Sequence, residues 1–105
     1  MSTRAVIATR TYEGTILATY LHFDGYPKRV LPILTEGYHD PDEAIELIQG
    51  GELRSLDPRP AEPEYFETSR RTEELKTDEE LVRLANYLNA QHIYFYDDYW
   101  HHRKV

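Results

Sequence analysis

The chain has 105 residues, a mass of 12.4 kDa and a formal net charge of −7. This length allows one domain with a single modest core, and the 40% hydrophobic fraction excludes a disordered chain. The lack of cysteine excludes disulfides and thiolate zinc sites. The sequence has no apolar run of membrane-spanning length and no signal-peptide-like apolar region after Met1. We therefore expect one cytoplasmic domain over residues 1–105.

Hydrophobic periodicity and capping signals divide the chain into strands and helices. The expected elements are strands over 4–10 and 16–23, helices over about 27–36 and 40–50, a proline-rich extended linker over 57–63, a helix over about 77–88, and strands over 92–96 and 99–104. Two capping boxes mark helix starts, at Asp40 and at Thr77. Residues 64–76 show neither a clear helix pattern nor a clear strand pattern. This order predicts an α+β fold, a three- or four-stranded antiparallel sheet with helices packed on one face.

Acidic side chains are concentrated in the middle of the chain. Residues 36–80 carry fifteen acidic and five basic side chains, whereas the rest of the chain carries four acidic and seven basic ones. Direct nucleic-acid binding is disfavoured, because it depends on Lys and Arg that neutralise phosphates. Two interpretations stay open: the acidic half is a solvated face, or it docks on a basic groove of a partner, including one that normally holds nucleic acid.

The turn between the second strand and the first helix is the first candidate site. It brings His22, Asp24 and Tyr26 together at a chain reversal, where loops expose side chains. His22 and Asp24 would share one face, and the pair suits a ligand or partner contact, or a general base with its orienting carboxylate. Asp24 as a helix cap is the structural alternative. Glycine is needed at position 25 if that residue takes a positive φ, and we expect a largely buried Tyr26 with His22 and Asp24 partly exposed on one rim.

Four other side chains are candidates for binding. Arg70 and Arg71 form a guanidinium pair suited to a carboxylate or a phosphate, unless they only balance neighbouring glutamates. Tyr94 and Tyr96 offer rings and hydroxyls to a partner or ligand, unless they fill a thin sheet. The sequence contains no phosphate loop or nucleophile elbow, and we expect no catalytic residue, no metal site and no cofactor.

Three segments resemble a family of small proteins of unassigned function that phages and mobile elements encode. These segments are Ser2-Thr3-Arg4-Ala5, Tyr20-x-His22-Phe23-Asp24-Gly25-Tyr26-Pro27 and Gly51-Glu52-Leu53-Arg54-Ser55-Leu56. The resemblance covers residues 2–56. Family members carry Trp where this chain has Phe23, and an Arg-Asp-Arg-Gly-Glu-like stretch where residues 69–73 align. The resemblance implies a phage or plasmid accessory protein, and it implies no particular reaction or ligand.

Together these features favour a small acidic accessory protein that binds a host component without catalysis. The more specific hypothesis is that it acts as an anti-defence inhibitor. The alternative is a sponge or sensor for a nucleotide-like small ligand, built on His22, Asp24 and Tyr26. A metal-independent hydrolase with His22 as base ranks last, so we expect that the protein is not an enzyme. The oligomeric state stays open, and a homodimer is one option.

Overall fold

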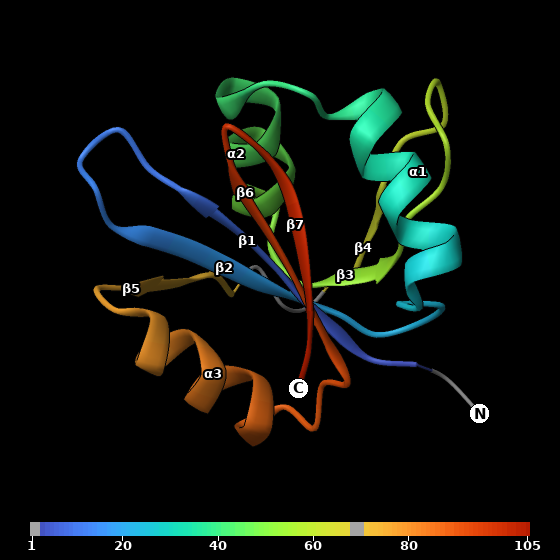
Figure 1. The fold of residues 1–105 in the computed structure, drawn as a ribbon. Coiled ribbons are helices and arrows are strands. Elements are labelled where there is room, and N and C mark those ends of the chain that lie inside the picture. The colour runs from blue at the N-terminus through green and yellow to red at the C-terminus, as the bar shows by residue number, and fades with distance from the viewer. Residues whose placement is uncertain (1–2, 68–70) are drawn as a thin grey trace.

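The structure is a computed structural model that describes residues 3–67 and 71–105 (Figure 1). In chain order the elements are β1 (Ala5–Arg10), β2 (Ile16–Leu21), α1 (Pro27–Gly37), α2 (Pro41–Gln49), β3 (Leu53–Ser55), β4 (Glu64–Tyr65), β5 (Glu73–Leu75), α3 (Asp78–Tyr87), β6 (His92–Asp97) and β7 (Tyr99–Lys104). The fold is α+β, as predicted.

The strands form one mixed sheet of seven strands, in the order β4-β3-β2-β1-β6-β7, with β5 also paired to β2. The β1–β2 and β6–β7 pairs are antiparallel hairpins, whereas β1–β6 and β2–β3 are parallel. The prediction of a three- or four-stranded antiparallel sheet is therefore wrong in strand number and direction. A parallel pair needs a crossover between its strands, and α3 completes that connection before β6 begins.

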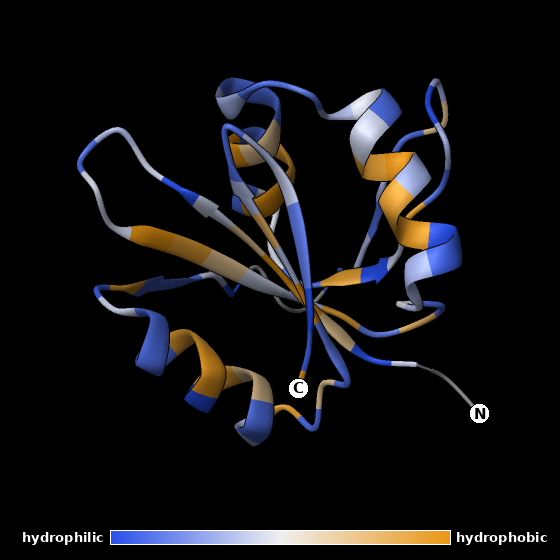
Figure 2. Ribbon diagram, in the orientation of Figure 1, coloured by the Kyte–Doolittle hydropathy of each residue, from blue (hydrophilic) through white to orange (hydrophobic). Residues whose placement is uncertain are grey.

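The helices cover both faces of the sheet, which corrects the prediction of one covered face. Ala5 and Ile7 of β1 belong to a core with α1 and α2, whereas Val6 and Ala8 belong to a second core with α3. Alternate residues of a strand point to opposite faces, so both faces of β1 are buried. Figure 2 shows apolar segments on all three helices.

The helix starts agree with the capping signals. The Asp40 side chain accepts a hydrogen bond of 2.8 Å from the Glu43 backbone N–H, and Thr77 accepts one of 3.2 Å from Glu80. By contrast, α1 has no side-chain cap and runs through Pro32 without interruption. None of the helices in the described ranges has the length and apolar character needed to cross a bilayer.

Residues 57–63 contain no helix or strand, as the prolines predict. The segment is not fully extended, because the Ala61 backbone N–H donates a hydrogen bond of 3.1 Å to the Pro58 carbonyl. This turn places the segment beside α1: a Cβ atom at Gly37 would lie 2.7 Å from Cγ of Arg59. The linker therefore belongs to the packed domain.

Candidate functional site

His22 lies where the chain leaves β2, and its position is fixed by neighbours. Its backbone N–H donates a hydrogen bond of 3.0 Å to the Leu53 carbonyl, and its Nδ1 shares one of 2.7 Å with the Tyr20 hydroxyl. Its ring meets Phe23 edge-on at 4.3 Å between centroids. Asp24 is exposed, and no hydrogen bond joins it to His22 within the described ranges. The His22–Asp24 hydrogen bond that the last-ranked hydrolase interpretation needs is therefore not formed.

The positive φ of this turn lies at Asp24, at 55°, so the condition under which φ would require glycine at position 25 is not met. Gly25 is needed for space instead, because a Cβ atom there would lie 2.8 Å from the Thr3 carbonyl oxygen and 2.9 Å from Cβ of Ala5. The turn therefore packs closely against the start of β1.

Aromatic rings and one guanidinium group surround His22 at the β3–β4 end of the sheet. Phe23 is 37% exposed, and Phe66 lies 5.8 Å from the His22 ring centroid. The Arg54 guanidinium lies over both phenyl rings, 5.9 Å from Phe23 and 5.8 Å from Phe66. We call His22, Phe23, Arg54 and Phe66 the His22 cluster. Sequence reasoning missed Phe66 and Arg54, because β3 and β4 were not recognised as strands that bring them to this edge.

Tyr26 is separated from the His22 cluster and is 42% exposed, so the prediction that it is largely buried is wrong. It is the N-cap residue of α1, and the buried stripe of that helix begins only at Val30. Tyr26 lines a cavity of about 560 Å³ between one side of α1 and the 58–59 segment. We call it the α1 cavity. Lys28, Arg29 and Arg59 share it with Tyr26, whereas neither His22 nor Asp24 lines it.

The arginine pair does not complete a site at the turn. Arg70 lies outside the described residues. Arg71 is exposed, and its Nε donates a hydrogen bond of 2.8 Å to the Glu73 carboxylate, which raises the pKa of Arg71. Its backbone carbonyl accepts a hydrogen bond from Thr19, at 3.3 Å. The observed contacts of Arg71 match local charge balance.

Tyr94 and Tyr96 are core residues. Tyr94 is 0% exposed, and its hydroxyl donates a hydrogen bond of 2.6 Å to the Gly25 carbonyl. Burial raises the pKa of Tyr94 well above its ordinary value. Tyr96 is 5% exposed and packs edge-on against Trp100. In this conformation the rings have almost no free surface for contact with a ligand or partner.

A second hollow, which sequence reasoning did not locate, gathers acidic side chains. It has a volume of about 670 Å³ and lies between the β1–β2 turn, α2 and β5. Its lining contains four carboxylates, those of Glu13, Asp42, Glu46 and Glu74. Leu17 and Ile45 add apolar walls, and no cation is present among the described residues that line it. We call this hollow the acidic groove.

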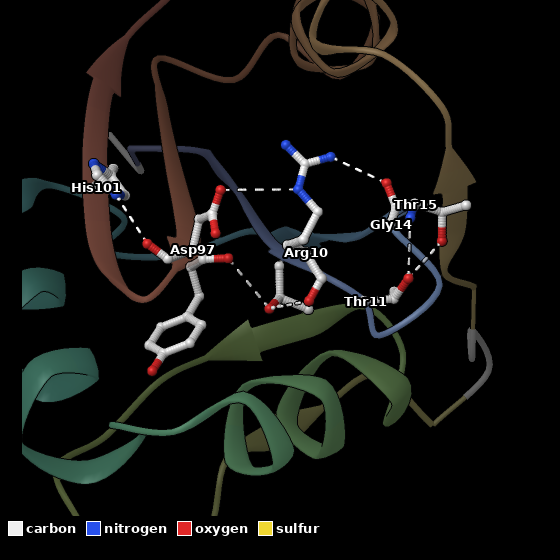
Figure 3. A network of polar contacts seen from close by, with 8 residues as sticks. Arg10, Thr11, Gly14, Thr15, Asp97 and His101 are labelled. Carbon is white, nitrogen blue, oxygen red and sulfur yellow. Dashed lines mark hydrogen bonds and ion pairs between the residues drawn. The ribbon is translucent and has the colours of Figure 1, made fainter.

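The β1–β2 turn, which carries Tyr12 and Glu13 to the groove, is held by a network of polar contacts (Figure 3). Arg10 donates a hydrogen bond of 3.2 Å to the Gly14 carbonyl, and its Nε lies 3.8 Å from the Asp97 carboxylate (Figure 3). The Thr11 and Thr15 hydroxyls share a hydrogen bond of 2.7 Å. Arg10 thus ties the turn to β6, and the Thr15 hydroxyl ties it to β5 by donating a hydrogen bond of 3.1 Å to the Glu74 carboxylate.

Tyr12 forms one wall of the acidic groove and is 72% exposed. Its hydroxyl donates a hydrogen bond of 2.6 Å to the Asp42 carboxylate, which links the turn to α2. This bond, together with the nearby negative charge, raises the pKa of Tyr12. The ring is therefore presented to solvent in a fixed position.

One further group of side chains has metal-ligand chemistry. His39, Asp40 and Glu43 place one potential ligand atom each within 4.8 Å of one another. Asp40 already caps α2, and His39 lies 3.6 Å from the Glu43 carboxylate. The helix cap accounts for the position of Asp40, and the contact with each other accounts for the positions of His39 and Glu43. We therefore assign no metal role to this group.

Comparisons with known proteins leave the site to be interpreted from its own geometry. No protein-family model, curated protein or solved structure matches this chain.

Proposed function

We propose that this chain is a non-enzymatic binding protein that docks on a cationic surface of a protein partner. The observation that carries the proposal is the acidic groove. Four carboxylates from three separate parts of the chain converge there, beside apolar walls and an exposed tyrosine ring. Lys or Arg side chains of a partner are the groups that such a surface attracts.

Two of the four charges of the groove are left available for a partner. Glu13 and Glu46 are exposed and form no ion pair within the described part of the chain. A cationic group of a partner could bind these two carboxylates without displacing an existing ion pair. The apolar surface of Leu17 and Ile45 adds area that a docked side-chain stem can cover.

Tyr12 supports the same function. Tyrosine is enriched at protein interfaces, because its ring offers a large contact area and its hydroxyl a polar contact. The hydrogen bond to Asp42 already restricts the Tyr12 side chain. Less conformational entropy is then lost on binding than for a freely rotating exposed ring.

The resemblance to phage-encoded proteins makes a host component the natural partner. The sharper form of the proposal is an anti-defence inhibitor, which would cover the basic nucleic-acid channel of a defence enzyme. The net charge of −7 suits that role, because an acidic protein competes for cationic surface without itself holding phosphates.

The His22 cluster offers a second contact surface within the same function. Its exposed phenyl ring and its guanidinium belong to the residue types enriched at interfaces. A His22→Ala variant should lose part of the affinity, because His22 supports the Phe23 ring at 4.3 Å.

The proposal is tested by affinity capture from host lysate at low and at moderately high salt. The wild-type protein should retain a specific partner at low salt and release much of it at high salt, because salt screens exposed charges. Neutralising the groove by Glu13→Gln together with Glu46→Gln should reduce capture of that partner at low salt.

A matched control separates the groove from the overall charge. Glu62→Gln together with Glu67→Gln removes the same two charges from exposed positions that do not line the groove. This control should capture the partner like the wild type. Equal loss in both double variants, or recovery of no partner at either salt, would contradict the proposal.

A further inference from the structure

We infer that the α1 cavity binds a free nucleotide, with cations on one wall for the phosphate and the Tyr26 ring for the base. This site is distinct from the acidic groove, and it goes beyond the proposed docking function. It shares only Tyr26 with the rim expected from the sequence.

The size and lining of the cavity suit a small ligand. Its volume of about 560 Å³ falls within the range of small-molecule sites, about 300–1,000 Å³. Pro32, Ile33 and Pro58 supply apolar surface. The exposed ring of Tyr26 stands at the same cavity and can stack on a flat heterocycle.

The charge of the lining is opposite to that of the molecule as a whole. The net charge of the chain is −7, yet the cavity is lined by three cationic side chains and one carboxylate, that of Glu36. Five arginines outside the cavity form ion pairs with acids, namely Arg10, Arg54, Arg71, Arg83 and Arg103. The cavity therefore concentrates positive charge on an acidic protein.

Two of these cations have no carboxylate partner. Neither Lys28 nor Arg59 takes part in an ion pair among residues 3–67 and 71–105. Both are exposed and line the same cavity. A phosphate monoester can accept hydrogen bonds from an ammonium group and from a guanidinium group together.

Arg59 is positioned by packing instead of by an acid. Its guanidinium carbon lies 4.3 Å from the centroid of the Tyr38 ring. Its stem passes Gly37, where a Cβ atom would lie 2.7 Å from Cγ of Arg59. This contact with the ring holds the guanidinium at the cavity, where an anion can reach it.

Arg29 holds the cavity wall together. Its Nη2 donates a hydrogen bond of 3.0 Å to the Leu56 carbonyl and one of 2.8 Å to the Asp57 carboxylate. These bonds join α1 to the segment that precedes Pro58. The cavity is therefore preformed, so little ordering is needed when a ligand enters.

A free nucleotide fits better than a nucleic-acid strand. A strand carries many phosphates, and the acidic surface beyond the cavity would repel them. One terminal phosphate with one base matches the small number of cations and the single exposed ring.

The test is isothermal titration of the purified full chain with AMP, adenosine, inorganic phosphate and a short single-stranded oligonucleotide. AMP should bind at least 10-fold more tightly than each of the other three. Heat from AMP that is no greater than that from buffer would overturn the inference. Equal affinity for adenosine would remove the role of the cations, and equal affinity for phosphate would remove that of the ring. Tighter binding of the oligonucleotide would overturn the choice of a free nucleotide.

Paired variants locate the site. Lys28→Gln with Arg59→Gln should weaken AMP binding at least 10-fold, whereas Lys76→Gln with Arg83→Gln removes the same two residue types outside the cavity and should leave it unchanged. Because Arg59 packs on Tyr38, circular dichroism melts must show that the first variant is folded. Tyr26→Ala, at an exposed position, is the independent variant and should also weaken AMP binding. Unchanged AMP affinity in the folded Lys28→Gln/Arg59→Gln variant or in Tyr26→Ala would contradict the inference.

Discussion

The Tyr94 hydroxyl donates a hydrogen bond of 2.6 Å to the Gly25 carbonyl, which joins β6 to the turn that precedes α1. The two residues are 69 positions apart in the sequence, and Tyr94 is fully buried. The bond fixes the backbone between the His22 cluster and the α1 cavity. Both candidate surfaces therefore depend on a core tyrosine.

Tyr94→Phe should lower the free energy of unfolding by about 1–2 kcal/mol, because it leaves the Gly25 carbonyl without this partner. Urea denaturation measures the change. Tyr96→Phe is the control, since its hydroxyl makes a longer bond of 3.3 Å to the His39 carbonyl and should matter less. A larger loss for Tyr96→Phe would contradict this ranking.

Tyr26→Ala should cost less than about 1 kcal/mol of stability, as substitutions at exposed positions usually do. Tyr38→Ala should cost about 3–5 kcal/mol, because Tyr38 is 1% exposed and its ring fills the core below α1. Thermal melts of the two variants compare these costs directly. A similar loss in both would mean that Tyr26 is packed in solution.

Gly25→Ala should destabilise the protein by about 1–3 kcal/mol, because its Cβ atom would approach the Thr3 carbonyl oxygen and Cβ of Ala5 closer than van der Waals contact. Asp24→Gly should stay within about 1 kcal/mol of the wild type, since glycine adopts the φ of 55° without a steric penalty. Denaturation of both variants tests which residue the turn requires. The opposite order would contradict the close packing of Gly25 against Thr3 and Ala5.

The parts of the fold that the sequence predicts well are those with local causes. Asp40 caps α2 and Thr77 caps α3, each through a hydrogen bond to the backbone three residues further along the chain. The sequence signal for each helix start therefore lies within one helical turn. The β1–β2 and β6–β7 hairpins are likewise formed by neighbours in sequence. Their segments could therefore be assigned from pattern alone.

The parts that the sequence does not predict depend on distant partners. β3 is registered on β2 at a single residue pair, Leu21 with Leu53, and β4 has only two residues. Such short strands have no periodicity to detect. The parallel β1–β6 pair joins segments more than 80 residues apart, and no local signal specifies its direction.

The candidate sites show the same division. Composition indicated an acidic half, but the approach of Glu13 and Glu74 to one groove depends on the pairing of β2 with β5. The rim at residues 22–26 was expected to act as one unit. The structure divides it, because Tyr26 begins α1 while His22 still belongs to the end of the sheet.

His92 should make stability depend on pH. Burial lowers the pKa of His92, and positive charge on His102 and Lys104 lowers it further. The unfolded chain, with an ordinary histidine pKa of about 6.5, therefore binds a proton more readily than the folded chain. The stabilisation is present above about pH 6.5 and is lost as the pH falls toward the lower pKa of His92 in the folded chain.

Urea denaturation at about pH 7.5 and about pH 5 should show a smaller decrease in unfolding free energy for His92→Gln than for the wild type. His101→Gln, which changes an exposed histidine of the same hairpin, should retain the wild-type decrease. If His92→Gln and the wild type lose equal stability over this range, His92 does not cause the pH dependence.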